Sequence, residues 1–317
     1  MPLQFGRSGF IRCGEESTYG TASGSKTVFS RINSASLQST QERERKTFLS
    51  QSSAAFSVGH FDVFTVVGGT VELPLFYSGS GIYLKAACGT LTDTSTGGSP
   101  AEQHQYIPSA ALPSLTIDLQ RGTGSLEQFS GCMISTLTIS GAAGEEVMMS
   151  MDIIAQSATA REALISPSFG TGSQVFHYEN DSNKLAFNGG NYAMKSFEFN
   201  LDNKLDRRNL LGSKQTLQPV ISDVREVSLS VTLEMEDDAL YNAMLAGTTS
   251  DVSIKFVRSD ADCEILLRNC YISEYSDPVS TFGPLERTVT FVGESDSSDE
   301  AFEIIIKNAE ASGISNN

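Results

Sequence analysis

Apolar and polar residues alternate along most of the chain. Every second residue is apolar from Val71 to Tyr77, and again from Val227 to Met235. An alternation of period two predicts a strand with one buried face. Further strands are predicted at 115–119, 133–139, 147–154, 197–201, 252–257, 265–272, 287–292 and 302–306. The pattern therefore predicts a mainly β protein.

Two short helices are predicted to interrupt these strands at matching places. Asp237 and Asp238 can start a helix over residues 239–246, and Gly247 can end it. Ser80 and Gly89 bracket the other helix, over residues 81–88. Each helix follows one of the two alternating runs, which indicates that the chain repeats one design.

Two ordered matches support an internal duplication. A shift of 158 positions places strand on strand without a gap, Ile82 on Leu240 and Gly89 on Gly247. Farther along, a shift of 138 places Cys132 on Cys270 and strand 149–153 on 287–291. The difference, 158 − 138 = 20, implies a net insertion of 20 residues in the first copy. The polar stretch 91–110 is the natural place for this insertion.

The duplication predicts two tandem domains, each a β-sandwich or open barrel with one short α-helix. Domain 1 covers residues 27–157, with the insertion near 91–110, and domain 2 covers residues 158–310. Residues 1–26 are rich in Gly and Ser and are predicted to form an N-terminal arm. Residues 311–317 are predicted to form a loose tail.

Charge and cysteine content narrow the possible functions. The net charge is −16, and no Lys/Arg cluster of the kind that grips phosphates is present. Solubility alone explains this acidity, and so does a surface that avoids nucleic acid. The five cysteines form no CxxC motif, and no apolar signal segment precedes them. They are expected to be reduced core residues of a protein assembled in a cytosol.

A search for chemical sites along the sequence finds none. The Gly20–Thr27 stretch has Ser25 where a phosphate loop needs Gly before its Lys. His60, His104 and His177 lack partners at metal-ligand spacing. Residues 180–183 resemble a calcium loop but lack its later Gly and Glu. We therefore expect no catalytic, cofactor-binding or metal-binding residue, and no apolar stretch of about 18 residues could span a membrane.

Four carboxylates lie on the solvent side of predicted strands: Glu72, Asp152, Glu226 and Glu234. They can be ordinary solvated surface. They can also line an acidic channel if the same face is repeated around a ring. Such a channel would repel phosphates over about 8–10 Å at physiological salt, and DNA could slide through without sticking.

Three short segments carry a resemblance to a known family. Residues 14–21, GEESTYGT, contain an E-x-x-Y-G-T opening, and residues 195–203, KSFEFNLDN, form a strand with a trailing Asn. Residues 225–227 then lead into the second strand–helix pair. Together these segments resemble the tail tube proteins of bacteriophages with long, flexible, non-contractile tails. The apparent doubling departs from the simplest members and puts the number of chains in a ring in doubt.

The resemblance implies β-sandwich domains whose sheets join into a ring around a channel. Since rings of one-domain members are hexamers, a doubled chain is expected to form trimers of approximate sixfold symmetry that stack head to tail. The N-terminal arm and a charged hairpin are expected to reach the adjacent ring, although the hairpin can equally be a solvated turn. Its charged residues are Glu42, Arg43, Glu44, Arg45 and Lys46.

The same resemblance implies the partners and the location of the protein. The partners are other copies of the chain, the tape-measure protein, the tail terminator and the baseplate or tip proteins. Double-stranded DNA is expected to pass through without specific binding, and no membrane partner is expected. The protein would assemble in the host bacterial cytoplasm and reside in the virion tail.

Other functions stay open from the sequence. A tail terminator or adaptor seldom needs a duplicated chain of this length. A carbohydrate-binding β-sandwich would favour surface aromatics, and this chain contains no Trp. A hydrolase on a β-fold would need a nucleophile or metal site, and none is recognisable.

Overall fold

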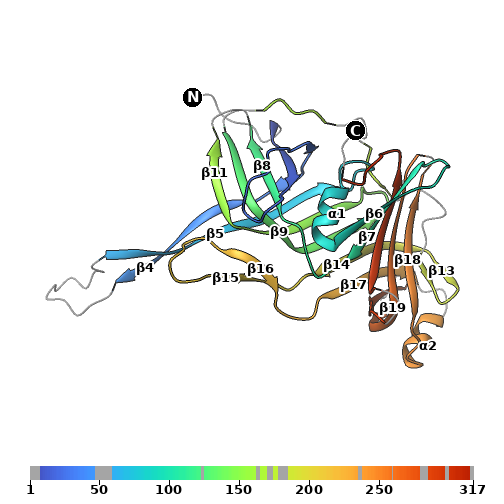
Figure 1. The fold of residues 1–317 in the computed structure, drawn as a ribbon. Helices are drawn as coiled ribbons and strands as arrows, with labels where there is room; N and C mark the ends of the chain where they lie inside the picture. Colours follow the sequence, from blue (N-terminus) through green and yellow to red (C-terminus); the bar gives the residue numbers. More distant parts are fainter. Residues whose placement is uncertain are drawn as a thin grey trace.

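The computed structural model describes residues 8–46, 59–122, 125–161, 165–169, 174–177, 185–234, 238–258, 260–278, 285–296 and 300–314. Within these residues the chain forms antiparallel strands and two short helices (Figure 1). The predicted mainly β class is confirmed. Residues 180–183, Met235 and Asp237 lie outside the described residues, and with them the calcium-loop comparison and one proposed helix cap.

One long sheet runs through both halves of the chain. Its strands follow the order β4, β5, β10, β9, β14, β17, β20, β19, and the short β3 lies beside β4 on the same side of β5. We call this the long sheet. Its members are β3 (Ser34–Ala35), β4 (Gln38–Lys46), β5 (Gly59–Pro74), β9 (Ser125–Ala142), β10 (Met148–Ala155), β14 (Met194–Asp202), β17 (Glu226–Glu234), β19 (Asp262–Ser276) and β20 (Glu286–Val292).

Two further sheets cover one face of the long sheet, because β9 and β19 each continue from it into a second layer. The first flanking sheet comprises β2 (Val28–Ser30), β1 (Phe10–Glu15), β8 (Leu115–Arg121), the start of β9, and β11 (Ser157–Arg161). The second comprises β13 (Gly190–Tyr192), β12 (Leu185–Phe187), β18 (Ser250–Val257), the start of β19, β21 (Phe302–Asn308), β7 (Glu102–Pro108) and β6 (Gly89–Ser95).

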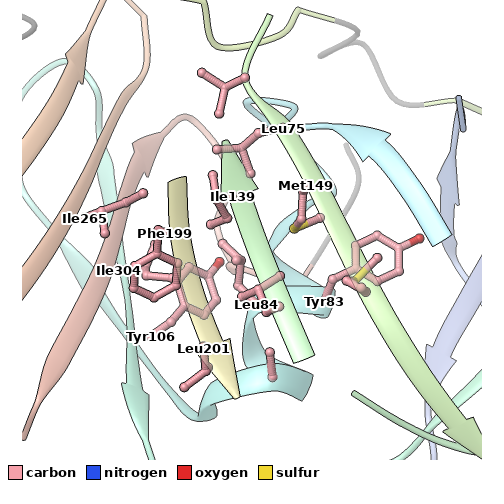
Figure 2. Packing of buried hydrophobic residues seen from close by; sticks show 14 of the residues in the cluster. Leu75, Tyr83, Leu84, Tyr106, Ile139, Met149, Phe199, Leu201, Ile265 and Ile304 are labelled. Carbon is pink, nitrogen blue, oxygen red and sulfur yellow. The ribbon is translucent and has the colours of Figure 1, made fainter. Parts of the chain in front are cut away.

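The apolar face of each alternating strand points between the layers. Ile139, Phe199 and Leu201 of the long sheet meet Ile265 and Ile304 of the second flanking sheet (Figure 2). All five side chains are buried, and they belong to one apolar cluster that extends through both halves. The predicted alternation is therefore realised as a two-layer core.

The two helices lie where the sequence predicts them. Helix α1 spans Gly81–Cys88 and helix α2 spans Ala239–Leu245. Gly89 and Gly247 follow them with positive φ angles of 116° and 62°. The N–H of Gly247 donates to the carbonyl of Met244, so a left-handed glycine closes α2 as expected.

Strand pairing supports the 138-residue match. Ile134 pairs with Ile153 in the first half, and Ile272 pairs with Phe291 in the second. Both hairpins carry a β-bulge directly after this pair. Equivalent residues therefore occupy equivalent places in the sheet, and the β-bulge lies at the same place in both hairpins.

The 158-residue match is correct for the helices but wrong for the strands before them. Val71 pairs with Met151, and Val231 pairs with Val289, the counterpart of Met151. The strands thus correspond at 231 − 71 = 160. The second copy has two residues fewer between strand and helix. An alternation of period two looks the same after a shift of two, so the sequence pattern could not separate the two registers.

The predicted insertion forms a hairpin instead of a polar loop. Strands β6 and β7 pair with each other, and β7 also pairs with β21, placing Tyr106 opposite Ile304. A segment from the first half therefore extends a sheet of the second half.

The arm and tail predictions are wrong for the residues that the structure describes. Strand β1 lies between β2 and β8, and Ile11 and Cys13 are fully buried there. At the other end, the carbonyl of Gly313 accepts a hydrogen bond of 2.8 Å from the Tyr106 hydroxyl, and Ile314 packs against the core. Buried apolar side chains anchor the N-terminal and C-terminal segments, although many of the adjacent residues in the sequence are polar.

Two hairpins extend from the long sheet. The outer part of β4 and β5 projects from the body, and a smaller hairpin of β15 (Leu205–Arg208) and β16 (Leu217–Ile221) lies near its base (Figure 1). The N–H of Thr65 donates to the carbonyl of Lys214, and Lys214 pairs with Asp62 at 2.8 Å. The predicted charged hairpin is therefore present, and its base contacts the second half.

Candidate assembly surface

The four predicted carboxylates lie on one surface. Glu72 belongs to β5, Asp152 to β10, and Glu226 and Glu234 to β17. Their sequence neighbours Val71, Met151, Val227 and Leu233 are buried, so each carboxylate points away from the core. We call this side of the long sheet the outer face. The structure brings the four residues onto one continuous sheet.

Hydroxyl groups occupy much of the rest of the outer face. Thr70 donates a 2.7 Å hydrogen bond to Asp152, and Ser34 donates one of 3.0 Å to Glu72. Other members are Thr136, Thr138, Ser140, Ser150, Ser196, Glu198, Asn200, Asp202, Ser228, Ser230, Thr232, Thr288 and Thr290. The surface is polar and rich in small side chains.

Two lysines neutralise part of this charge. Lys195 lies 3.2 Å from Glu234 and 2.6 Å from Glu286, and the hydrogen bonds that its ammonium donates to Glu286 and Glu234 raise its pKa. Lys204 lies 2.8 Å from Asp202 and 3.0 Å from Glu226, and the same cause raises its pKa. Burial tends to raise the pKa of Asp202, but hydrogen bonds from Lys204 outweigh burial and lower it.

The middle of the outer face keeps its negative charge. In the described part of the chain, no salt bridge involves Glu72, Asp152 or Glu198. Glu198 also lines an open depression of about 360 Å³ together with Glu145 and Glu146. Uncompensated carboxylates on a hydroxyl-rich sheet disfavour contact with phosphates.

The charged residues of β4 are all exposed. Arg43 lies 3.2 Å from Asp62 on β5, and the Lys46 ammonium lies 5.8 Å from the Phe61 ring. Hydrogen bonds from Lys214 and Arg43 lower the pKa of Asp62. Glu42, Glu44 and Arg45 complete the predicted set on the same strand.

Each end of the long sheet has an open edge. Strand β4 pairs only with β5, and the last part of β19, Tyr271–Ser276, pairs only with β20, among the residues that the structure describes. Unpaired N–H and C=O groups at such edges favour pairing with another strand. These edges are therefore candidate contacts between copies of the chain.

A buried carboxylate explains the E-x-x-Y-G-T segment. Glu16 accepts hydrogen bonds from the hydroxyls of Ser114 and Thr116, both at 2.7 Å, and from the N–H groups of Gly131 and Gly20, at 2.8 and 2.9 Å. Gly20 has φ of 74°, and an added Cβ would lie 1.9 Å from the Gln156 side chain. The segment therefore joins the N-terminal strand to β8 and β9. Sequence reasoning noticed the motif but not this structural role.

The trailing Asn of the second motif connects the two halves. Asn203 is fully buried, and its side-chain amide donates to the carbonyls of Ala87 in α1 and Ile134 in β9, at 3.0 and 2.9 Å. Its N–H donates to the carbonyl of Ser135. One residue of the second half thus holds the end of the first helix.

His104 and the five cysteines lie inside the fold. His104 is fully buried, and its ring nitrogens lie 2.7 Å from Asp93 and 2.9 Å from Asn308. All five cysteines are free and buried, and burial raises the pKa of both Cys13 and Cys88 to about 12. The described residues contain no group of His, Cys, Asp and Glu placed to hold a metal ion.

Comparison with known proteins adds a family assignment. No helix among the described residues has the length and apolarity to cross a membrane. A search of curated proteins finds no match. The sequence profile described as phage tail tube protein matches residues 6–303, which is most of the chain. The chain therefore belongs to the phage tail tube protein family.

Proposed function

We propose that this protein polymerises as stacked rings into the tail tube of a phage with a long, non-contractile tail. Family membership identifies it as a structural tail tube component and implies self-assembly into a tube. The proposal adds that each ring is a trimer with approximate sixfold symmetry. The tube would enclose the tape-measure protein, contact the terminator and the baseplate or tip proteins at its ends, and later conduct DNA outward.

The observation that carries this proposal is the long sheet. Each half contributes four strands in one order, β4, β5, β10 and β9 in the first half and β14, β17, β20 and β19 in the second. Strand β9 joins β14, so the two sets form a continuous surface. Three such chains would supply six equivalent sets around a channel, and closing the ring would cover the open edges.

The outer face is the proposed channel wall. Glu72, Asp152, Glu226 and Glu234 would then face the passing DNA and disfavour binding of its phosphates. If the outer face lay on the tube exterior instead, reversing its charge would not change how the channel holds DNA. Asp152→Lys should cause assembled tubes to retain double-stranded DNA at low salt, whereas Glu264→Lys on the second flanking sheet should not. Equal retention by both variants would contradict the assignment.

The charged outer part of strand β4, residues 42–46, is proposed to reach the adjacent ring. Arg43 and Arg45 would contribute to stacking, together with Glu42, Glu44 and Lys46. Replacing Arg43 and Arg45 with Glu should shorten the tubes while leaving individual rings intact. The result is read from tube lengths by electron microscopy.

Negative-stain microscopy of the purified protein tests the main proposal. Tubes built from rings of three chains are the expected result, and the mass of isolated rings gives the number of chains. Compact monomers alone under polymerising conditions, with none of the protein in tails, would contradict it. Rings of six separate chains would refute the trimer.

A further inference from the structure

The junction between the two halves is a template for contact between chains. Within the chain, β9 pairs antiparallel with β14, and the register places Thr136 opposite Asp202, Leu137 opposite Leu201 and Thr138 opposite Asn200. These strands are the last of the first set and the first of the second set. In a ring, the next such junction would join β19 of one chain to β4 of its neighbour.

The repeat gives the register of this second junction. Adding 138 converts Thr136, Leu137 and Thr138 of β9 into Glu274, Tyr275 and Ser276 of β19. For the other strand, Ala35 pairs with Val71 and Phe197 pairs with Val231, the counterpart of Val71. The offset is therefore 197 − 35 = 162. It converts Asn200, Leu201 and Asp202 into Gln38, Ser39 and Thr40.

The two helices differ in how far they are covered. Helix α1 is covered at the β9–β14 junction within the chain, whereas α2, beside the edge of β19, is not. Helix α1 packs on β9, and its buried Leu84 belongs to the same apolar cluster as Phe199 and Leu201 from the second half (Figure 2). The carbonyl of Ala87 accepts hydrogen bonds from Asn203 and Arg225, also from the second half. Seven α1 residues are buried.

Helix α2 lacks the corresponding cover. It packs on β19, but only Leu240 is buried among its residues. Leu245, the counterpart of Ala87, is 65% exposed, and Asn242, the counterpart of Leu84, is also exposed. Helix α2 also contacts the open edge of β19, because the Tyr241 ring lies 5.4 Å from the ring of Tyr275. The exposed Leu245 and the open edge of β19 both indicate that a neighbouring chain is missing here.

We propose that β19 of one chain pairs antiparallel with β4 of a second copy, with α2 packed beneath the seam. Ser276 pairs with Gln38, Tyr275 with Ser39, and Glu274 with Thr40 of the neighbouring copy. Gln41 of that copy takes the position that Asn203 has within the chain, and its N–H faces the carbonyl of Ser273. This proposal rests on the proposed ring assembly and specifies its contact.

Disulfide trapping in assembled tubes tests the register. The double variant Thr40→Cys/Glu274→Cys should give, after mild oxidation, covalent dimers and trimers on a non-reducing gel. The ladder should end at the number of chains in the ring. The control Ser36→Cys/Glu274→Cys places the two thiols four residues out of register, about 13 Å apart along the strand. It should give little cross-linking, and the five native cysteines are buried.

A second pair of variants tests the helix. Leu245→Glu should abolish rings while the free chain keeps its circular dichroism spectrum and thermal midpoint. Leu211→Glu makes the same change at a fully exposed site in the β15–β16 connection and should leave ring formation intact. Equal loss of rings in both variants would overturn the role of α2.

The outcomes separate this proposal from the proposed function. Tubes that form without in-register cross-links, or with equal cross-linking in the control, would overturn the β19–β4 contact and leave tube formation standing. Failure of the unmodified protein to form any tube would refute the proposed function, and this contact with it. In-register cross-linking that ends at trimers would support both.

Discussion

Helices α1 and α2 follow equivalent strands and end in equivalent glycines, yet their surroundings differ. Helix α1 lies between β9, the β6–β7 hairpin and the second half of the chain, and seven of its residues are buried. Helix α2 touches β19 and buries only Leu240. The burial of a short helix is therefore set by its neighbours more than by its own sequence. When one copy of a repeated helix is buried and the other is exposed, the exposed copy indicates where a neighbour is missing.

The difference extends to the first residue of each helix. An added Cβ on Gly81 would lie 1.7 Å from the carbonyl oxygen of Gly313, whereas α2 begins with Ala239. The C-terminal segment and the insertion hairpin occupy this space in the first half. The second half has no such cover in the part of the chain that the structure describes.

The largest effect is expected from removing apolar volume at the covered helix. Leu84→Ala should lower the free energy of unfolding by about 2–5 kcal/mol, because it leaves a cavity beneath the β9–β14 junction. Leu245→Ala in α2 should change the free chain by less than about 0.5 kcal/mol. Urea denaturation of monomers measures both. A similar cost for both variants would break the comparison.

Adding volume at the same helix should have the next largest effect. Gly81→Ala should cost about 1–3 kcal/mol, because its Cβ collides with the backbone of the C-terminal segment. Limited proteolysis should then release residues near Gly313 sooner than in the unmodified protein. Ala239→Gly reverses the difference in α2 and should cost no more than about 1 kcal/mol, from helix propensity alone.

Removing the link between the halves should have a smaller effect. Asn203→Ala leaves the carbonyls of Ala87 and Ile134 without its amide and should cost about 1–2 kcal/mol. Asn200→Ala on the outer face removes a single 3.4 Å contact to Thr138 and should cost less than about 0.5 kcal/mol. Thermal unfolding of the two variants gives the difference, and equal midpoints would argue against a linking role for Asn203.

The last effect concerns alkaline stability and is absent at neutral pH. Burial raises the pKa of Cys88 from 9.0 to about 12 in the folded chain. The folded state thus holds this proton more tightly, so its contribution is complete below pH 9 and is lost as pH rises toward 12. Cys88→Ala, which matches Ala246 after α2, should reduce the fall in stability by up to about 1.4 kcal/mol per pH unit in this range. Denaturation series at pH 8 and pH 10.5 give the two slopes.

Short-range pattern was enough to predict many elements. The alternation around Val231 predicts a half-buried strand, and Gly89 and Gly247 mark the ends of both helices. The Cys132–Cys270 match predicts a shift of 138 residues, which agrees with the strand pairs Ile134–Ile153 and Ile272–Phe291. The carboxylates Glu72 and Asp152 were placed on the solvent side for the same reason, since the side-chain direction alternates along a strand.

Other features could not be predicted because they depend on distant partners. His104 is buried only because β7 lies beside β21, where Asn308 reaches its ring. In the sequence Glu16 resembles a surface carboxylate, but in the fold Ser114, Thr116 and Gly131 surround it. The polar composition of residues 91–110 hid two strands, because strands near a sheet edge need few apolar residues.

The sequence by itself determined the β class and the helix positions and predicted two related halves, because alternation and glycine stops act over a few residues. Only the tertiary structure decided that β9 joins β14, that the strands before the helices correspond at 160 residues, and that β4 and β19 end the long sheet among the described residues. Pairing between strands brings together residues far apart in the chain, and their hydrogen bonds come from the backbone, which every residue carries. The pattern of side chains therefore says little about which strands become neighbours.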